Sequence, residues 1–331
     1  MRRGDTIVTK LLISRFIHTL LRAGWFNYID RRINKLRIWR IVAGIILIIF
    51  LSDGVTNAQE VSIDMASKVN QEVISKLSSL YGSTPEIIQH IDLTKPFETK
   101  SRWTLVVGKE PDKSASTTNA FGETIGALSV CFVKNDIPDC SQKTILEKYQ
   151  DQNISIAPGD RPFYELFTSE IVFSGAVKTQ PLVMLKTCTM AGANGNCGIS
   201  TFLFDYDREM DHFRLVFFNV TGRNNNQETR FVECGPLQGN VIAVYPTENA
   251  PFTYYVEVYK KNTVGMYAQA LRYRGRTGYG DGNRLKVIDS EMPEILRRLN
   301  LWKLGDALPT PPKIPLGCTQ LVIRKGTEWC K

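Results

Sequence analysis

Four acidic side chains in the second half of the chain are of the kind that catalyses hydrolysis. Asp205 and Asp207 stand two residues apart, and Glu233 and Glu257 follow them in strand-like segments. A pair of carboxyl groups cleaves a glycosidic bond when one acts as the acid and the other as the base or nucleophile, and their separation decides the mechanism. Sequence alone does not give that separation. The four residues are therefore candidates for the catalytic groups of a hydrolase acting on glycan or peptide substrates.

A second group, between residues 254 and 279, combines phenol rings with guanidinium groups. Side chains alternate along a strand, so Tyr255, Glu257 and Tyr259 should share one face, and Tyr267 and Tyr273 one face of the next strand. An exposed aromatic platform flanked by polar groups could stack on sugar rings or a peptide. Packing of the rings in a core, with their hydroxyl groups at the rim, is the favoured interpretation. The candidate ligand-binding residues are Tyr255, Tyr259, Tyr267, Arg272, Tyr273 and Arg274.

The sequence lacks the motifs of most other chemistries. It has no Gly-x-Ser-x-Gly nucleophile elbow, and its cysteines and histidines lack the close spacing of zinc ligands. Acidic residues at every second position of 205–211 are hard oxygen ligands of the type that calcium takes. They lack the glycine and the distal glutamate of a helix-loop-helix calcium loop, so a solvated hairpin tip is favoured. The glycine-rich segment 275–283 precedes a strand-like segment, which favours a hairpin turn at Asp281–Gly282 over a phosphate loop. We expect no metal and no cofactor.

Cysteine spacing indicates an oxidising compartment. All seven cysteines lie beyond residue 130, and six of them fall into local pairs. Such pairs close small loops in exported proteins, although connectivity cannot be deduced from spacing alone. The predicted disulfides are Cys131–Cys140, Cys188–Cys197 and Cys318–Cys330, with Cys234 left over.

An apolar run near the start of the chain suggests how the protein reaches such a compartment. Residues 41–51 follow the basic residues Arg37 and Arg40. The run is shorter than the roughly 20 residues that a membrane-spanning helix needs, but it matches the apolar core of a signal peptide. Small side chains just before Gln59 favour cleavage there. The alternatives are an uncleaved membrane anchor and a buried core helix.

The net charge of +8 comes from the leader. Residues 1–40 hold ten of the 41 Lys and Arg residues and two of the 33 Asp and Glu residues, so residues 41–331 hold 31 of each sign. The balanced remainder gives no electrostatic footprint for nucleic acid, and we expect no such partner. Within the leader, residues 7–26 have the pattern of a basic amphipathic helix on a membrane surface, whereas a translation start after Met1 is the alternative.

The hydrophobic pattern predicts a mainly β fold, an antiparallel sandwich or barrel-like sheet with an N-terminal helical segment and a short C-terminal helix. Helices are expected over 62–81, over 84–91 and, capped by Ser290, over 291–299. Many short strands without alternating helices favour antiparallel pairing. Strands are expected at 103–107, 128–133, 170–175, 182–188, 199–206, 212–220, 229–234, 240–245, 253–260, 266–274 and 284–288, with hairpin turns at 207–211 and 222–226 and a short helix at 141–149.

Three parts of the chain are expected to differ in role. Residues 1–58 form the basic leader with a signal peptide or uncleaved anchor, 59–98 a helical segment packed on the sheet, and 99–331 a disulfide-stabilised β domain with a C-terminal helix and tail. Without a strong catalytic motif, we expect an exported cell-envelope protein, periplasmic or extracellular, that binds or scaffolds a glycan, peptide or protein without catalysis. Membrane contact is expected only through 1–58. An envelope hydrolase using carboxylates is the alternative.

Overall fold

The computed structural model describes most of the chain beyond residue 66. It describes residues 67–80, 82–112, 126–140, 165–175, 180–191, 197–310 and 312–331, which belong to one compact unit, Ala66–Lys331. The apolar run 41–51 and the predicted helix 141–149 lie outside these ranges. Within them, no helix has the length and apolar character that crossing a membrane requires.

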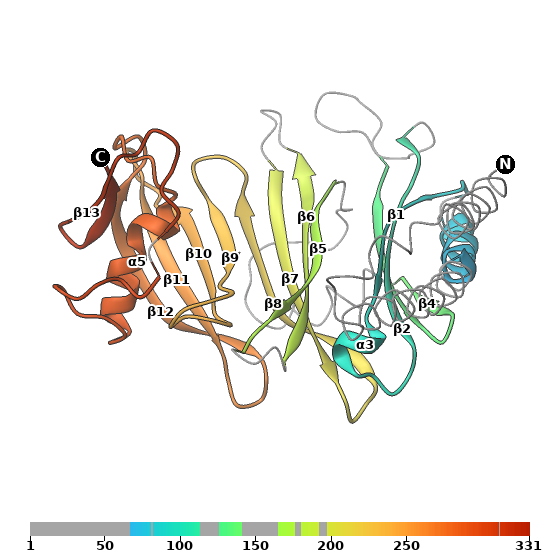
Figure 1. The fold of residues 1–331 in the computed structure, drawn as a ribbon. Helices are drawn as coiled ribbons and strands as arrows, with labels where there is room; N and C mark the ends of the chain where they lie inside the picture. The colour runs from blue at the N-terminus through green and yellow to red at the C-terminus, as the bar shows by residue number, and fades with distance from the viewer. Residues whose placement is uncertain are drawn as a thin grey trace, which may run out of the picture. The chain divides into compact units, whose positions relative to one another are not determined.

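The described residues form four antiparallel sheets and few helices, which confirms the predicted fold class (Figure 1). In each sheet the strands pair with their neighbours along the chain, so short turns join most of them. The sheets are β1 (Glu86–Asp92), β2 (Trp103–Lys109), β3 (Leu128–Lys134) and β4 (Ile137–Asp139); β5 (Glu165–Phe173), β6 (Pro181–Ala191), β7 (Cys197–Asp207) and β8 (His212–Gly222); β9 (Glu228–Phe231), β10 (Val241–Pro246), β11 (Thr253–Lys261) and β12 (Tyr267–Gly278); and the hairpin β13 (Leu321–Arg324) and β14 (Thr327–Cys330).

The sheet β5–β8 is buried on both faces. Phe202 and Phe204 point to one side and pack in a core with residues of β2 and β3. Leu203, between them, points to the other side and packs in a second core with residues of β9 and β10. This arrangement explains why β6, β7 and β8 contain apolar runs instead of the alternation of a sheet with one wet face.

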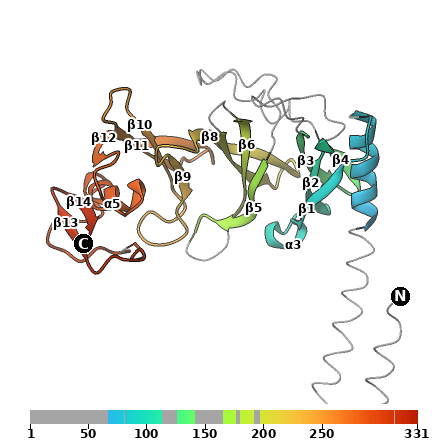
Figure 2. The same ribbon diagram turned by 90° about the horizontal axis from the view of Figure 1, so that it is seen from above.

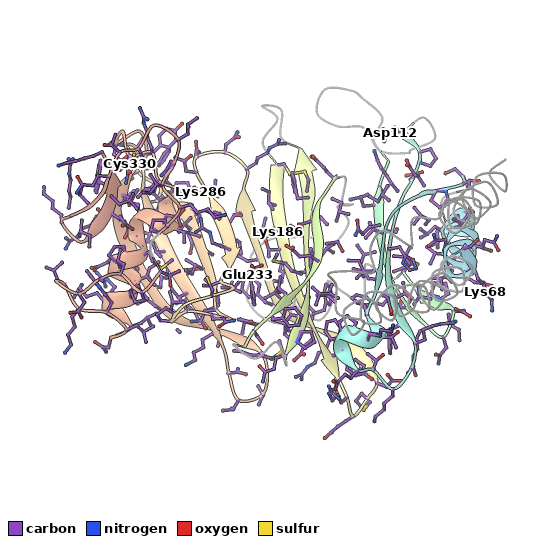
Figure 3. All side chains as sticks on the ribbon, in the orientation of Figure 1. Lys68, Asp112, Lys186, Glu233, Lys286 and Cys330 are labelled. Atoms are coloured by element: carbon purple, nitrogen blue, oxygen red, sulfur yellow. A yellow bond between two sulfur atoms is a disulfide. The ribbon has the colours of Figure 1, made fainter. Side chains whose placement is uncertain are left out.

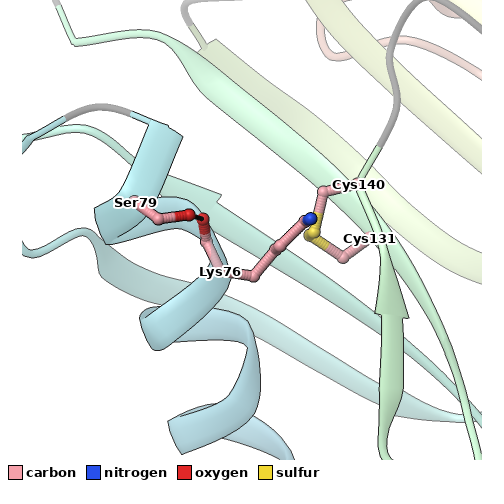
Figure 4. The surroundings of a disulfide bond; sticks show 4 residues. All are labelled: Lys76, Ser79, Cys131 and Cys140. Carbon is pink, nitrogen blue, oxygen red and sulfur yellow. Dashed lines mark hydrogen bonds between the residues drawn. A yellow bond between two sulfur atoms is a disulfide. The ribbon is translucent and has the colours of Figure 1, made fainter.

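A helix over residues 67–80 covers the opposite face of the sheet β1–β4 (Figures 1 and 2). Val69, Val73 and Leu77 recur every fourth residue and are buried against that sheet, as the predicted helix over 62–81 requires. The same core contains Cys131 and Cys140. Figure 4 shows Lys76 reaching from the helix toward these two cysteines, with the Ser79 hydroxyl donating to the Lys76 carbonyl at 2.7 Å.

The predicted helix over 84–91 is wrong, because this segment is the strand β1. Ile87, Ile88 and Ile91 are β-branched, which favours strands over helices. β1 pairs antiparallel with β2, with His90 opposite Val106. Pairing with a neighbouring strand thus outweighs the local helix signal, and only a short helix follows, α3 (Thr94–Phe97).

The predicted strand at 284–288 is also wrong, because it runs into the helix α5 (Val287–Arg298). Val287 and Ile288 are buried in a core that α5 shares with β10, β11 and β12. The helix therefore begins before Ser290, and Ser290 is not its cap. Its hydroxyl instead donates to the Glu328 carbonyl at 3.0 Å and ties α5 to β14.

The carboxylate of Glu291 ties α5 to β12. Its side chain is fully buried and faces Gly275, where a Cβ atom would lie 2.9 Å from Oε1. The carboxylate is thus the acceptor for backbone N–H and side-chain hydroxyl groups of β12. Its donors are the Arg276 N–H (2.8 Å), the Thr277 N–H (2.7 Å), the Thr277 hydroxyl (2.7 Å) and the Tyr273 hydroxyl (3.0 Å).

The turn expected at 222–226 does not join a hairpin but connects two different sheets. β8 pairs with β7, whereas β9 pairs with β10, so the chain leaves one sheet and enters the next at this point. The turn itself is as predicted: Asn225 and Asn226 have left-handed φ angles of 60° and 54°, which asparagine tolerates better than most residues. Local turn signals locate a reversal but do not say which strands it joins.

Two of the three predicted disulfides are present. Cys131 is bonded to Cys140 and Cys188 to Cys197, each pair with a sequence separation of 9. The bonds support an oxidising, exported environment for the protein.

Removing the first disulfide is expected to destabilise the fold. In the chain-entropy model, a crosslink closing a loop of this length stabilises by about 2–3 kcal/mol, so the double variant C131S/C140S should lose about that much free energy of unfolding in urea titrations. The variant C234S, which removes an exposed free thiol, should change it by less than about 0.5 kcal/mol. Equal stability of C131S/C140S and the parent protein would contradict the expectation.

Candidate ligand-binding site

A buried carboxylate organises the aromatic residues of the sheet β9–β12. Glu257, on β11, is 5% exposed. It accepts hydrogen bonds from the hydroxyl groups of Tyr245 and Tyr259, the latter at 2.5 Å. Arg272 forms an ion pair with the same carboxylate at 3.3 Å. The carboxylate therefore fixes three side chains from three adjacent strands.

Strand register explains why these side chains meet. Tyr245 on β10 lies opposite Tyr255 on β11, and Glu257 lies opposite Arg272 on β12. Because residues two apart on a strand share a face, Tyr255, Glu257 and Tyr259 point the same way. The intervening residues of β11 point toward α5 and fill its core.

Tyr245, Tyr255 and Arg272 form the outer part of this group, which we call the Tyr–Arg surface. The Arg272 guanidinium lies over the Tyr255 ring, 5.0 Å from its centroid, and the rings of Tyr245 and Tyr255 are 5.8 Å apart. The Arg272 side chain is 51% exposed, and both rings are half-buried. The surface thus presents ring carbons and free guanidinium N–H groups to solvent.

The phenol groups act as hydrogen-bond donors to Glu257. Burial raises the pKa of Tyr245 and of Tyr259, and the hydrogen bonds to Glu257 raise both further. Both hydroxyl groups therefore stay protonated at physiological pH. Their donated hydrogen bonds fix the orientation of the rings before any ligand arrives.

Tyr267 and Tyr273 do not belong to this surface, and they do not share a face as predicted. The register between β11 and β12 shifts by one residue near Tyr259, and such a bulge reverses the side-chain alternation beyond it. Tyr267 packs beside Phe217, with ring centroids 5.7 Å apart. Tyr273 is buried against α5, where its hydroxyl donates to Glu291.

Arg274 lies on the same sheet, beyond Arg272 along β12. Its guanidinium donates from Nε to the Thr253 hydroxyl at 2.7 Å, and the residue is exposed. Of the six predicted ligand-binding residues, the structure thus brings Tyr255, Tyr259, Arg272 and Arg274 onto one region of the sheet. Tyr245 was missed, although it ends the predicted strand 240–245, which precedes the strand that contains Tyr255.

The four predicted catalytic carboxylates are dispersed. Asp205 forms an ion pair with Lys261 at 2.8 Å, and Asp207 accepts hydrogen bonds from two backbone N–H groups within its own hairpin turn. Glu233 is exposed beyond the end of β9 (Figure 3). Only Glu257 contacts the Tyr–Arg surface, and its carboxylate is already bonded to Tyr245, Tyr259 and Arg272. No two of the four form a facing pair in the described interactions.

The last acidic residue of the β7–β8 turn, Asp211, has a structural role. Its carboxylate accepts from four donors, of which Trp103 on β2 and Lys134 on β3 join the turn to the sheet β1–β4. Burial alone would raise the pKa of Asp211, but these hydrogen bonds outweigh burial and lower it. The donors are the Ser101 hydroxyl (2.5 Å), the Trp103 indole N–H (3.0 Å), the Tyr206 hydroxyl (2.6 Å) and the Lys134 ammonium (2.8 Å).

Metal-binding groups are not assembled in the described part of the chain. Within those residues, no three His, Cys, Asp or Glu side chains are placed to hold one ion. The acidic side chains of 205–211 instead serve separate partners, as the ion pair of Asp205 and the hydrogen bonds of Asp207 and Asp211 show.

The predicted Cys318–Cys330 disulfide is not present, and both residues are free thiols. The strand pairing places Leu321, three residues beyond Cys318, opposite Cys330. The thiols are nevertheless close. Burial raises the pKa of Cys330, and a hydrogen bond with the Cys318 thiol raises it further.

Comparisons with known proteins add little to this geometry. No family model matches the chain, and no solved structure matches it. A 2-isopropylmalate synthase from Cronobacter sakazakii (strain ATCC BAA-894) is 28% identical over 135 residues, a match covering 31% of this chain. The chain spans 26% of the length of that synthase, so the likeness does not show a family.

Proposed function

We propose that this chain is an exported cell-envelope protein that binds a glycan on the Tyr–Arg surface without catalysing a reaction. The observation that carries the proposal is the arrangement around Glu257, which holds Tyr245 and Arg272 in fixed positions. Arg272 in turn lies over the ring of Tyr255, and both tyrosine rings are partly open to solvent. Tyrosine and arginine are the residues most often found where binding energy is concentrated. Rings held in place before binding lose little conformational entropy on contact with a ligand.

A glycan suits the chemistry of this surface better than a peptide. Ring carbons of Tyr245 and Tyr255 offer apolar contact to the C–H faces of a sugar, while Arg272 offers N–H donors to its hydroxyl oxygens. The rings of Tyr245 and Tyr255 lie on a sheet face rather than at a free strand edge, because β10 and β11 are each paired on both sides. An added peptide strand requires such an edge.

The absence of turnover is supported by the partners of the carboxylates. Glycoside hydrolysis needs two carboxyl groups flanking the scissile bond, whereas Asp205, Asp207 and Glu257 are each engaged by other groups of the fold. The two disulfides support export. Export through a signal peptide at 41–51, cleaved before Gln59, belongs to the proposal.

Replacing Tyr255 should weaken glycan binding. Y255A removes the ring on which Arg272 lies, and loss of a central aromatic contact typically lowers affinity by about tenfold or more. Saturable binding of the purified protein to isolated envelope glycan measures the effect, and mass spectrometry of the glycan tests for cleavage.

The matched control is Y279A, which removes a tyrosine that is 48% exposed outside the Tyr–Arg surface. It should bind as the parent protein does. Equal loss in both variants, or binding only to envelope peptides, would contradict the glycan proposal. Release of glycan fragments that E257Q abolishes would establish the hydrolase alternative.

A further inference from the structure

A polar pocket lies away from the Tyr–Arg surface, where the chain passes from β8 to β9. Residues 226–228 of this connection form one wall, and residues 283–286, just before α5, form the other. Its volume is about 270 Å³. A water molecule takes up about 30 Å³ in the liquid, so the pocket has room for a ligand the size of a monosaccharide.

Glu228, the acidic residue of the pocket wall, is already neutralised by Arg230. Both carboxylate oxygens of Glu228 accept hydrogen bonds from Arg230, at 2.7 and 2.9 Å. The same guanidinium donates to Asp289 at 2.5 Å on its other side. Because Arg230 is shared between two carboxylates, neither Glu228 nor Asp289 needs a cationic ligand to complete its hydrogen bonds.

Asn283 holds the opposite wall in place. Its amide nitrogen donates to the Ser290 hydroxyl at 3.0 Å and to the Glu328 carbonyl at 2.9 Å. Its amide oxygen accepts from the Leu285 N–H at 3.2 Å. The wall is thus fixed to α5 and β14 before any ligand enters.

The uncommitted groups in the pocket wall are cations and a neutral amide. Lys286 is exposed, and its ammonium group forms no hydrogen bond or ion pair with any described residue. Arg284 donates one N–H to the Gly317 carbonyl at 2.7 Å, which leaves most of its guanidinium fork free. Gln227 uses its amide oxygen to accept from the Gly222 N–H, which leaves its NH₂ group as a donor.

The surroundings add a third cation and one carboxyl group. Burial lowers the pKa of Lys186, the carboxylates of Glu228 and Glu170 oppose this shift, and the charges of Arg230 and Lys286 add to it (Figure 3 labels Lys186 and Lys286). Glu328 is 4% exposed, and burial together with the charge of Asp289 raises its pKa to about 7. Glu328 therefore carries only part of a negative charge at neutral pH.

We propose that this pocket binds a small ligand through a carboxylate or phosphate group, held by Arg284 and Lys286. Guanidinium and ammonium groups recognise both oxyanions, and arginine can bind either with two parallel hydrogen bonds. The pocket is a second site, independent of the glycan proposal, because the two sites share no residue.

Titration of the full chain with four probes tests the proposal. Glucuronate and glucose 6-phosphate carry the two oxyanions on a monosaccharide, inorganic phosphate carries one alone, and glucose is the matched neutral control. Both charged sugars should bind at millimolar concentration or below, and glucose should not. The tighter of the two identifies whether carboxylate or phosphate is the natural group.

Variants that remove one positive charge test whether Arg284 and Lys286 bind the anionic group. R284Q and K286Q should each weaken binding of the charged sugars by about tenfold or more, because each removes a charge-assisted hydrogen bond. K303Q removes an exposed ammonium outside the pocket wall and should leave affinity unchanged. Thermal unfolding of each variant confirms that the fold is intact.

Three results would overturn the proposal: equal binding of glucose and glucuronate, undiminished binding in the double variant R284Q/K286Q, or no binding of any charged probe. None of these results bears on the Tyr–Arg surface. Conversely, Y255A should bind the charged sugars as the parent protein does, which keeps the two proposals separable.

Discussion

Replacing Glu291 with alanine should lower the free energy of unfolding by about 3–5 kcal/mol, because buried donors would lose their acceptor. The carboxylate receives four hydrogen bonds, of which two come from backbone N–H groups of β12. Water cannot replace it readily, since Glu291 is fully buried. The expected measurement is a shift of the urea midpoint with an unchanged denaturant slope.

Two further variants separate the hydrogen bonds of Glu291 from its volume. E291Q keeps the shape of the side chain but turns one acceptor into a donor, so it should also be destabilised, by less than E291A. E209A removes a glutamate exposed in the β7–β8 turn and should change stability by less than about 0.5 kcal/mol. If E291Q equalled the parent protein, the hydrogen bonds would not be the source of the stabilisation.

Replacing Asp211 with asparagine should cost about 2–3 kcal/mol, because the charged acceptor of four hydrogen bonds becomes neutral. Asparagine is the informative substitution, since Asp211 has a left-handed φ of 49° that asparagine also adopts. Lys134 would then lose its ion-pair partner between two sheets. Chemical denaturation at neutral pH measures the loss.

The pH dependence of stability distinguishes the charge of Asp211 from its shape. Its pKa is lower in the folded protein than in the unfolded chain, so its stabilisation is complete above the unfolded pKa of about 4 and is lost as pH falls toward the folded pKa. The parent protein should therefore lose more stability between about pH 5 and pH 2 than D211N does. E209Q, in the same turn, should follow the parent curve. Parallel curves for D211N and the parent protein would contradict this role.

Features encoded over short distances were predictable from sequence. The helix over 67–80 follows from the three- to four-residue period of its apolar side chains. The hairpin of β7 and β8 follows from two apolar segments on either side of the polar turn 207–211. The disulfides Cys131–Cys140 and Cys188–Cys197 each bridge a separation of 9 residues. In each case the partners lie close along the chain, so local spacing contains the information.

Features that depend on distant partners were not predictable. The segment Glu86–Asp92 becomes a strand because β2 lies beside it, and residues 284–288 enter a helix because Val287 and Ile288 fill a core against other strands. The chain also changes sheets after β8, which its turn residues do not reveal. Tertiary contacts decide each of these outcomes.

The candidate site was partly predictable for the same reason. Alternation on one strand correctly places Tyr255, Glu257 and Tyr259 on one face. The error with Tyr267 and Tyr273 comes from one additional residue in β12, which the sequence does not mark with a glycine or proline. The pocket at 226–228 and 283–286 joins segments that are far apart in sequence, so no local motif pointed to it.

The two-sided burial of β5–β8 limits how the protein can be dissected. A fragment ending after β8 would expose Leu203, Val216 and Phe217, and a fragment beginning at β9 would lack the surface that covers Phe231 and Val241. Uncovered apolar patches of this kind promote aggregation. Expression of either half alone should therefore give insoluble material, whereas the halves supplied together could reassemble by complementation.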